Sequence, residues 1–369
     1  MKTKPGFAFI VLAWMAGVHP VTAQPALGIA PAGKQSVLYW PVTPTNYLVQ
    51  SATNLASPNW IYAGDAVPLA AAIVSNTSPV RFFRLISTNP PAGMALIPAG
   101  AFVMGNSTGD GDIGDASPVN IFVSAFYMDT NLVSYTLWQT VYNAAVTFDG
   151  YSFANTGAGK GANYPVETVD WYDCVKWCNA RSQLAGLTPV YYTDAGLTQV
   201  YKTGETDNLY VNWTANGFRL PTEAEWEKAA RGGLNGRRFP WGNLISESQA
   251  NYYGDTNDYN YDLGPNGYNA IGSVGGTSPA TSPVGSFDVN GYGLYDMAGN
   301  VFEWCWDWYG TPYGQPTAFN PTGPTSGSSR VSRSTYFGFP ANYARCASRL
   351  GLGPTSAAVG TGFRCVRGL

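Results

Sequence analysis

The segment Gly217-Phe-Arg-Leu-Pro-Thr-Glu-Ala-Glu-Trp-Glu-Lys-Ala-Ala-Arg-Gly-Gly233 contains the clearest folding signal of this 369-residue chain. Thr222 follows a proline, and its hydroxyl can accept a hydrogen bond from the backbone of a helix that begins there. Glu225 stands three residues later, where its carboxylate can return the bond, so the two residues form a capping box. The sequence therefore predicts a helix over residues 222–230.

The chain on either side of this helix predicts an α+β domain with much irregular loop. A second helix is expected over residues 170–184, which are rich in tryptophan, valine and cysteine at packing positions. After Gly232, about 60 residues are rich in glycine, asparagine and tyrosine. Loops of this length in a compact domain are usually functional, or are held by ions and packing.

Composition excludes several classes of protein. Charged residues make up 12% of the chain and aromatic residues 14%, the reverse of a disordered sequence. The formal net charge is −3 and there is no basic run, which argues against a nucleic-acid groove or an anionic membrane surface. The only histidine is His19. If processing removes it, the mature protein can build neither a Ser–His–Asp triad nor a histidine-ligated zinc site.

Residues 1–23 have the pattern of a secretory signal peptide. Lys2 and Lys4 precede a short apolar stretch at 7–18, and small residues precede a cleavage point near Gln24. The apolar stretch is too short to span a bilayer, which needs about 20 residues. We therefore expect an exported protein without a membrane span, in the periplasm, on the cell surface or in the medium.

Residues 30–88 predict a small antiparallel β module. Short β-rich runs at 36–40, 47–51, 59–63 and 80–86 are separated by turn residues. The module contains no cluster of acids, amides or thiols, so we interpret it as a spacer or docking module. Residues 89–95, Asn-Pro-Pro-Ala-Gly-Met-Ala, predict a linker to the main domain at 96–369.

Four blocks in the main domain resemble, in order and spacing, the formylglycine-generating enzyme family, also called sulfatase-modifying factors. They lie at 97–105, 217–233, 291–304 and 362–367, and a weaker block covers 165–178. The resemblance implies a C-type-lectin-like fold of the formylglycine-generating-enzyme type.

Acidic residues among the tryptophans of these blocks are expected to be paired or to bind metal, because buried charges must be compensated. Glu223 and Glu225 favour structural salt bridges. Glu303 has a second interpretation, since it and Asp296 bracket backbone carbonyls in a glycine-containing turn, the kind of oxygen ligands that Ca²⁺ takes. The resemblance implies a calcium site at Asp296, Gly299, Val301 and Glu303. It also implies half of a second site at Asn251 and Tyr252, with Asp262 or Asn266 as candidates for the other half.

The cysteines set this chain apart from the enzymes of the family. The resemblance implies a disulfide between Cys178 and Cys365, whereas the family partner of Cys346 is replaced by Ala230. The enzymes oxidise a sulfatase cysteine with O₂ and a copper ion held by two active-site cysteines. The corresponding residues here, 332–344, contain no cysteine. Because soft thiolates select Cu(I), copper is not expected, and neither is the oxidase activity.

The C-terminal residues 334–361 also resemble the variable region of proteins diversified by retroelements, which share this lectin-like fold. Such retroelements substitute adenines, often in Asn codons of the AAY type, and that process does not yield Trp, Gln, Met, Lys or Glu. None of these five residue types occurs between 334 and 361. Aromatic and small polar side chains build adaptable binding patches. The candidate ligand-binding residues are Tyr336, Phe337, Phe339, Asn342, Tyr343, Ser348, Leu350, Leu352, Thr355 and Ser356.

Three functions are consistent with these observations. The first is a non-catalytic protein that binds a protein or glycan ligand through residues 334–361, with the alternative that these side chains only fill the core. The second is an enzyme of the formylglycine-generating type. The third is a calcium-stabilised structural module of the cell surface.

Overall fold

The computed structural model describes residues 28–32, 35–39, 47–52, 61–62, 71–75, 82–87, 89–273, 280–310 and 319–369. The expected signal peptide at 1–23 lies outside the described residues. The chain divides into two compact units, one up to Asn89 and one from Pro90 to Gly368. No helix in the described ranges is long and apolar enough to cross a membrane.

The first unit contains two antiparallel sheets of three strands each. One has the order β1-β2-β5 and the other β4-β3-β6. The four expected runs are confirmed as β2, β3, β4 and β6, whereas β1 and β5 were missed because alanine and glycine carry little strand preference. The bounds are β1 Gly28–Ala32, β2 Gln35–Tyr39, β3 Tyr47–Ala52, β4 Ile61–Tyr62, β5 Ala71–Ser75 and β6 Phe82–Ser87.

The second unit begins earlier than the sequence predicts. Strand β7 runs from Met94 to Ile97, so the last two residues of the expected linker at 89–95 belong to the domain. Met94 and Ala95 are buried and pair with strand β10. The predicted end of the linker at residue 95 is therefore corrected to residue 93, because Met94 and Ala95 are buried in the pairing of β7 with β10.

Two four-stranded sheets organise the second unit. The first has the order β13-β20-β10-β7 and joins the beginning of the domain to its end. The second has the order β18-β17-β16-β19, with β19 parallel to β16. Their strands are β10 Phe126–Asp129, β13 Phe218–Arg219, β16 Phe302–Trp308, β17 Arg330–Arg333, β18 Arg349–Leu352, β19 Thr361–Gly362 and β20 Val366–Arg367.

Short hairpins and loops complete the domain. Strands β8 and β9 form one antiparallel pair, as do β11 with β12 and β14 with β15. Their bounds, with one 3-10 turn, are β8 Gly100–Met104, β9 Val119–Val123, β11 Tyr191–Tyr192, β12 Tyr210–Val211, β14 Tyr253–Gly254, β15 Gly267–Tyr268 and η1 Ala270–Ser273.

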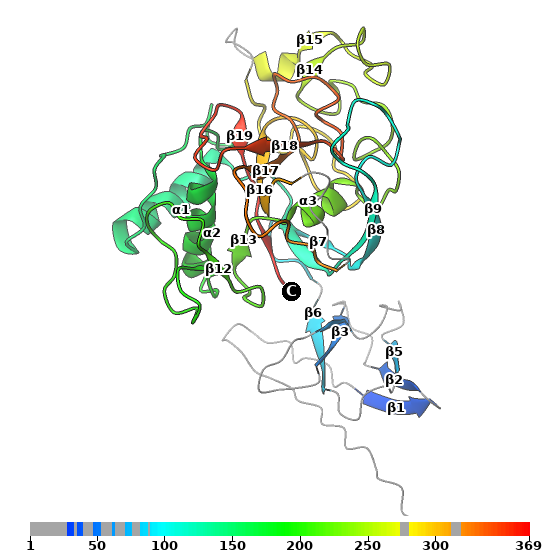
Figure 1. Cartoon of the computed structure of the whole chain (residues 1–369), viewed down its shortest axis with the longest axis vertical. Helices are drawn as coiled ribbons and strands as arrows, with labels where there is room; N and C mark the ends of the chain where they lie inside the picture. Colours follow the sequence, from blue (N-terminus) through cyan, green and yellow to red (C-terminus); the bar gives the residue numbers. More distant parts are fainter. Residues whose placement is uncertain are drawn as a thin grey trace, which may run out of the picture. The chain divides into compact units, whose positions relative to one another are not determined.

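The described residues contain three α-helices, of which two were predicted. Helix α2, Trp171–Leu184, begins after an Asp170 cap, and α3, Glu223–Ala230, begins with the expected capping box. Helix α1, Tyr135–Phe148, was missed, although its buried residues recur at helical spacing. Figure 1 shows α1 and α2 side by side, and α3 separately against the second sheet.

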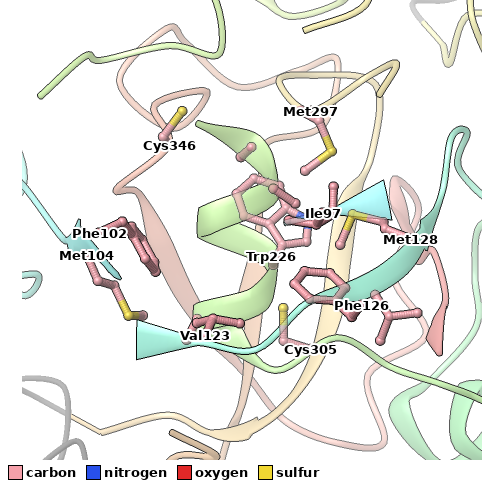
Figure 2. Packing of buried hydrophobic residues seen from close by; sticks show 14 of the residues in the cluster. Ile97, Phe102, Met104, Val123, Phe126, Met128, Trp226, Met297, Cys305 and Cys346 are labelled. Atoms are coloured by element: carbon pink, nitrogen blue, oxygen red, sulfur yellow. The ribbon is translucent and has the colours of Figure 1, made fainter. Parts of the chain in front are cut away.

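The main core surrounds helix α3. Trp226 is fully buried at its centre, with Ile97, Phe126 and Met128 from the first sheet around it (Figure 2). Cys305 and Cys346 lie in the same cluster. The short helices, small sheets and long loops confirm the expected α+β class.

Candidate functional site

Helix α3 directs carboxylates at β17, which precedes the C-terminal segment 334–361, and at β18, which lies within it. Glu223 accepts two hydrogen bonds of 2.7 Å from Arg349 and one of 3.2 Å from Arg333. Glu227 accepts a bond of 2.6 Å from Arg333 and pairs with Arg231 at 2.7 Å. The side chains of these five residues are at most 5% exposed. The arginines at the end of β17 and the start of β18 are therefore fixed to α3.

The expected salt bridge of Glu225 is also confirmed. Its two carboxylate oxygens each accept a bond of 2.6 Å from Arg219, while the capping box holds the same carboxylate at the helix start. The charges of Glu223 and Glu225 are thus structural, as the salt-bridge interpretation predicted.

A second arginine within the C-terminal segment is fixed by a glycine-rich acidic loop. Arg345 is 1% exposed and bonds to Asn106 at 2.9 Å and Thr108 at 2.7 Å. It also forms ion pairs with Asp110 and Asp112. A hydrogen bond from a neighbouring arginine is the largest cause that lowers the pKa of Asp110 to about 2. The anchoring loop was not found from sequence, because its partner lies more than two hundred residues further along the chain.

Between these anchors, aromatic side chains form a partly exposed cluster. Tyr336, Phe339 and Tyr343 are each partly buried. The ring centroids of Tyr336 and Phe339 lie 5.0 Å apart, and those of Phe339 and Tyr343 lie 4.8 Å apart. Phe302 of β16 contacts the first two rings at 5.7 and 5.5 Å. Such edge and tilted contacts are the arrangement that aromatic rings prefer.

Two of the predicted ligand-binding residues, Phe337 and Ser348, are buried, which disagrees with an exposed binding surface at these positions. Phe337 is 8% exposed, and its ring packs on Tyr336 with centroids 4.9 Å apart. Ser348 is 6% exposed and lies in the turn that leads into β18. Thr355 is exposed, and the other predicted residues are partly buried, namely Tyr336, Phe339, Asn342, Tyr343, Leu350, Leu352 and Ser356.

At the first predicted calcium site, the structure gives Glu303 a protein partner. Its oxygens accept bonds of 2.7 and 3.0 Å from Arg364, and both side chains are fully buried. Asp296 is different, because Oδ2 accepts a bond from Gly285, while the buried Oδ1 accepts no hydrogen bond of good geometry. Burial raises the pKa of Asp296 to about 6, although the nearby Asn300 side chain acts to lower it. A buried carboxylate oxygen without a good hydrogen bond fits a cation better than it fits a sealed core.

The glycine of this site has a steric role. Gly299 has a φ of +87°, and a Cβ there would lie 2.5 Å from the carbonyl oxygen of Asn251. The structure therefore brings Asn251, predicted for the second site, against the first. Among the described residues, no three His, Cys, Asp or Glu side chains group as a metal site. A calcium ion would thus depend on main-chain carbonyls of the kind that Gly299 and Val301 supply.

At the second predicted calcium site, the side chains form hydrogen bonds to other groups of the same loop. The Tyr252 hydroxyl donates to Asp262 at 2.5 Å, and Asp262 also accepts from the backbone of Asp255 and Gly264. Asn266 accepts from the backbone of Thr256. The structure therefore assigns Asp262 and Asn266 loop-closing roles, and calcium binding there stays a prediction.

All five cysteines are buried. The sulfur atoms of Cys178 and Cys365 face each other at 3.6 Å and are not bonded in the structure, whereas a disulfide has a length of about 2.05 Å. The disulfide stays a prediction, with its two residues brought together. Burial raises the pKa of Cys346 to about 11, and those of Cys174 and Cys305 well above their usual range. Thiols of this kind are poor thiolate ligands for copper.

A family model described as "Sulfatase-modifying factor enzyme 1-like domain" matches residues 83–369. The chain belongs to this family. The formylglycine-generating enzyme of Mus musculus is 32% identical over 306 residues, which cover 75% of this chain and 77% of that enzyme. That of Thermomonospora curvata is 33% identical over 295 residues, 74% of this chain and 92% of the enzyme.

The structure of the domain is similar to that of a variable protein. Treponema denticola variable protein 1 superposes with a TM-score of 0.58 at 28% identity, over 75% of this chain and 95% of that protein. CarF superposes with a TM-score of 0.54 at 27% identity, over 76% of this chain and 99% of CarF. The resemblance read from the sequence blocks, and the lectin-like architecture that it implied, are confirmed.

Proposed function

We propose that this protein is an exported, non-catalytic member of the sulfatase-modifying factor family that binds a protein or glycan through residues 334–361. One observation carries the proposal. Arg333, Arg345, Arg349 and Arg364 are buried and ion-paired to residues outside the segment, while rings and small polar residues between them stay partly exposed. Fixed ends with partly exposed side chains between them are what a rigid binding surface needs.

The cysteine content of the chain supports the non-catalytic part of the proposal. Residues 332–344 contain no cysteine where the enzymes of the family have their pair. The thiols of Cys174, Cys305 and Cys346 are buried with raised pKa values. These three thiols are therefore poor replacements for the missing copper ligands.

The likeness to a variable protein supports a diversified surface. If the segment is diversified, changes should be confined to codons of 334–361 and should leave Arg345 and Arg349 intact. Sequencing the gene in a population tests this directly, together with a search for a reverse-transcriptase gene and a near-copy of the segment beside it. Changes spread evenly over the whole gene would contradict diversification.

A paired substitution tests whether the rings belong to a surface or to the core. Phe339→Ser with Tyr343→Ser should destabilise the fold clearly less than Phe337→Ser, since removing a buried Phe side chain costs about 3–5 kcal/mol. The wild type and the double variant are then compared on arrays of glycans and cell-surface proteins. A ligand that binds both forms equally would exclude these rings from the binding surface.

A further inference from the structure

Lys228 lies on the last turn of α3 and is only 5% exposed. Its ammonium group donates to the carbonyl oxygen of Gly100 at 2.7 Å and, more weakly, to that of Val123 at 3.4 Å. Burial is the cause that lowers the pKa of Lys228 to about 8, and no neighbouring carboxylate raises it again. The other buried lysine of the domain, Lys176, is paired with Asp173 at 3.2 Å. Among the residues that the structure describes, Lys228 is therefore a buried cation without a counter-charge, a costly arrangement.

Lys228 and Gly100, whose carbonyl accepts its bond, both line a pocket of about 120 Å³. Liquid water occupies about 30 Å³ per molecule, so the space holds a few heavy atoms. Its lining contains no acidic side chain, and Arg231, which also lines it, is already bonded to Glu227. Polar groups on the wall come from Lys228, Asn235 and Tyr292, and apolar ones from Pro98, Phe102 and Leu234.

We propose that this pocket binds a short aliphatic carboxylate, with the carboxylate against Lys228 and the alkyl chain against the apolar wall. The carboxylate would supply the missing counter-charge, and a charge-assisted hydrogen bond is the stronger kind. The apolar residues favour a ligand with a short carbon chain over a bare inorganic anion. None of the lining residues belongs to 334–361, so the proposal is independent of the binding surface proposed above.

Butyrate, acetate and inorganic phosphate are suitable probes. In NMR titrations of the whole protein, butyrate should give saturable shifts at residues of the pocket at roughly millimolar concentration. Acetate should bind more weakly and phosphate most weakly. Lys228→Met should weaken butyrate binding roughly tenfold or more, the effect of losing one charge-assisted hydrogen bond. The matched control is Lys202→Met, because Lys202 also donates to a backbone carbonyl, that of Asp149 at 2.9 Å.

Chemical labelling keeps the proposal testable if Lys228→Met fails to fold. The wild-type protein is acylated with and without butyrate, and the peptides with Lys228 and Lys202 are quantified by mass spectrometry. Butyrate should protect Lys228 and leave Lys202 unchanged. Measurable acylation of Lys228 to the same extent in both samples would overturn the proposal. Phosphate binding as tight as butyrate binding, or unchanged butyrate affinity in a folded Lys228→Met variant, would also overturn it.

Discussion

Replacing Arg349 by methionine should remove an anchor of the C-terminal segment. Arg349 donates two bonds of 2.7 Å to Glu223 and one of 2.6 Å to the carbonyl oxygen of Gly310, and its guanidinium lies 4.5 Å from the ring centroid of Tyr309. Methionine keeps much of the volume and none of the charge. Glu223 would keep only its longer bond of 3.2 Å to Arg333.

The expected loss is large because a buried carboxylate is left undercompensated. Removing one partner of a buried ion pair costs about 3–5 kcal/mol, whereas replacing both partners by apolar residues is often neutral. For a domain of this size, each kcal/mol lowers the melting temperature by about 2–4 °C, so Arg349→Met should melt roughly 6–20 °C lower. Exposed Arg237 supplies the matched control, and Arg237→Met should change the melting temperature little.

A double-mutant cycle assigns the loss to the pair. Glu223→Leu with Arg349→Met should be less destabilised than the sum of the two single variants, by about 0.5–3 kcal/mol. Chemical denaturation of the four proteins measures the four unfolding free energies. A loss under about 1 kcal/mol for Arg349→Met, or strict additivity in the cycle, would refute the view that this ion pair anchors the segment.

Four further outcomes are expected. Calcium should raise the melting temperature, by the equivalent of about 2.7 kcal/mol at a hundred times Kd, and melting with EGTA or with Asp296→Ala should remove the effect; an unchanged midpoint would exclude the site. A cysteine-containing sulfatase peptide incubated with the copper-loaded protein should keep its sulfur by mass spectrometry, and turnover above a copper-only blank would contradict the non-catalytic proposal. Phe339→Ser with Tyr343→Ser should still give a cooperative melt, and a collapsed melt would place these rings in the core. Burial raises the pKa of Asp170 to about 7, so the contribution of this residue to stability is present below about pH 4 and is lost as the pH rises to 7. The stability of Asp170→Asn relative to the wild type should therefore increase from pH 4 to pH 7, as measured by denaturation at each pH. A difference in unfolding free energy that does not change with pH would argue against this prediction.

Local signals in the sequence were enough to predict elements whose stabilising partners are close in sequence. The capping box of Thr222 and Glu225 predicted the start of α3 correctly, because both partners lie within one helical turn. Helix α1 carried a similar signal in its Ser134 cap and was still missed. The boundary near Met94 could not be read locally, since it depends on pairing with β10.

The candidate sites depend on partners that are distant in sequence. Glu303 binds Arg364, which is 61 residues away, and Arg333 binds Glu227, which is 106 residues away. No spacing rule connects such residues. The family resemblance drew attention to Glu303, but its role as a calcium ligand stays a prediction. Burial of Phe337 between partly exposed neighbours follows from packing against Tyr336 rather than from residue type.

The positions of the counter-charges explain how a C-terminal segment could vary without unfolding the domain. Arg345 and Arg349 lie within the segment, but their carboxylate partners lie on the loop at 106–115 and on α3. A change at Tyr343 alters no member of these pairs, and its backbone bond to Pro340 does not depend on the side chain. The stabilisation of the segment is thus concentrated in the ion pairs of a few buried arginines, because removal of one arginine leaves its carboxylate partner uncompensated. Rings at the partly exposed positions can therefore change with little effect on the anchors, provided that the arginines and their partners are kept.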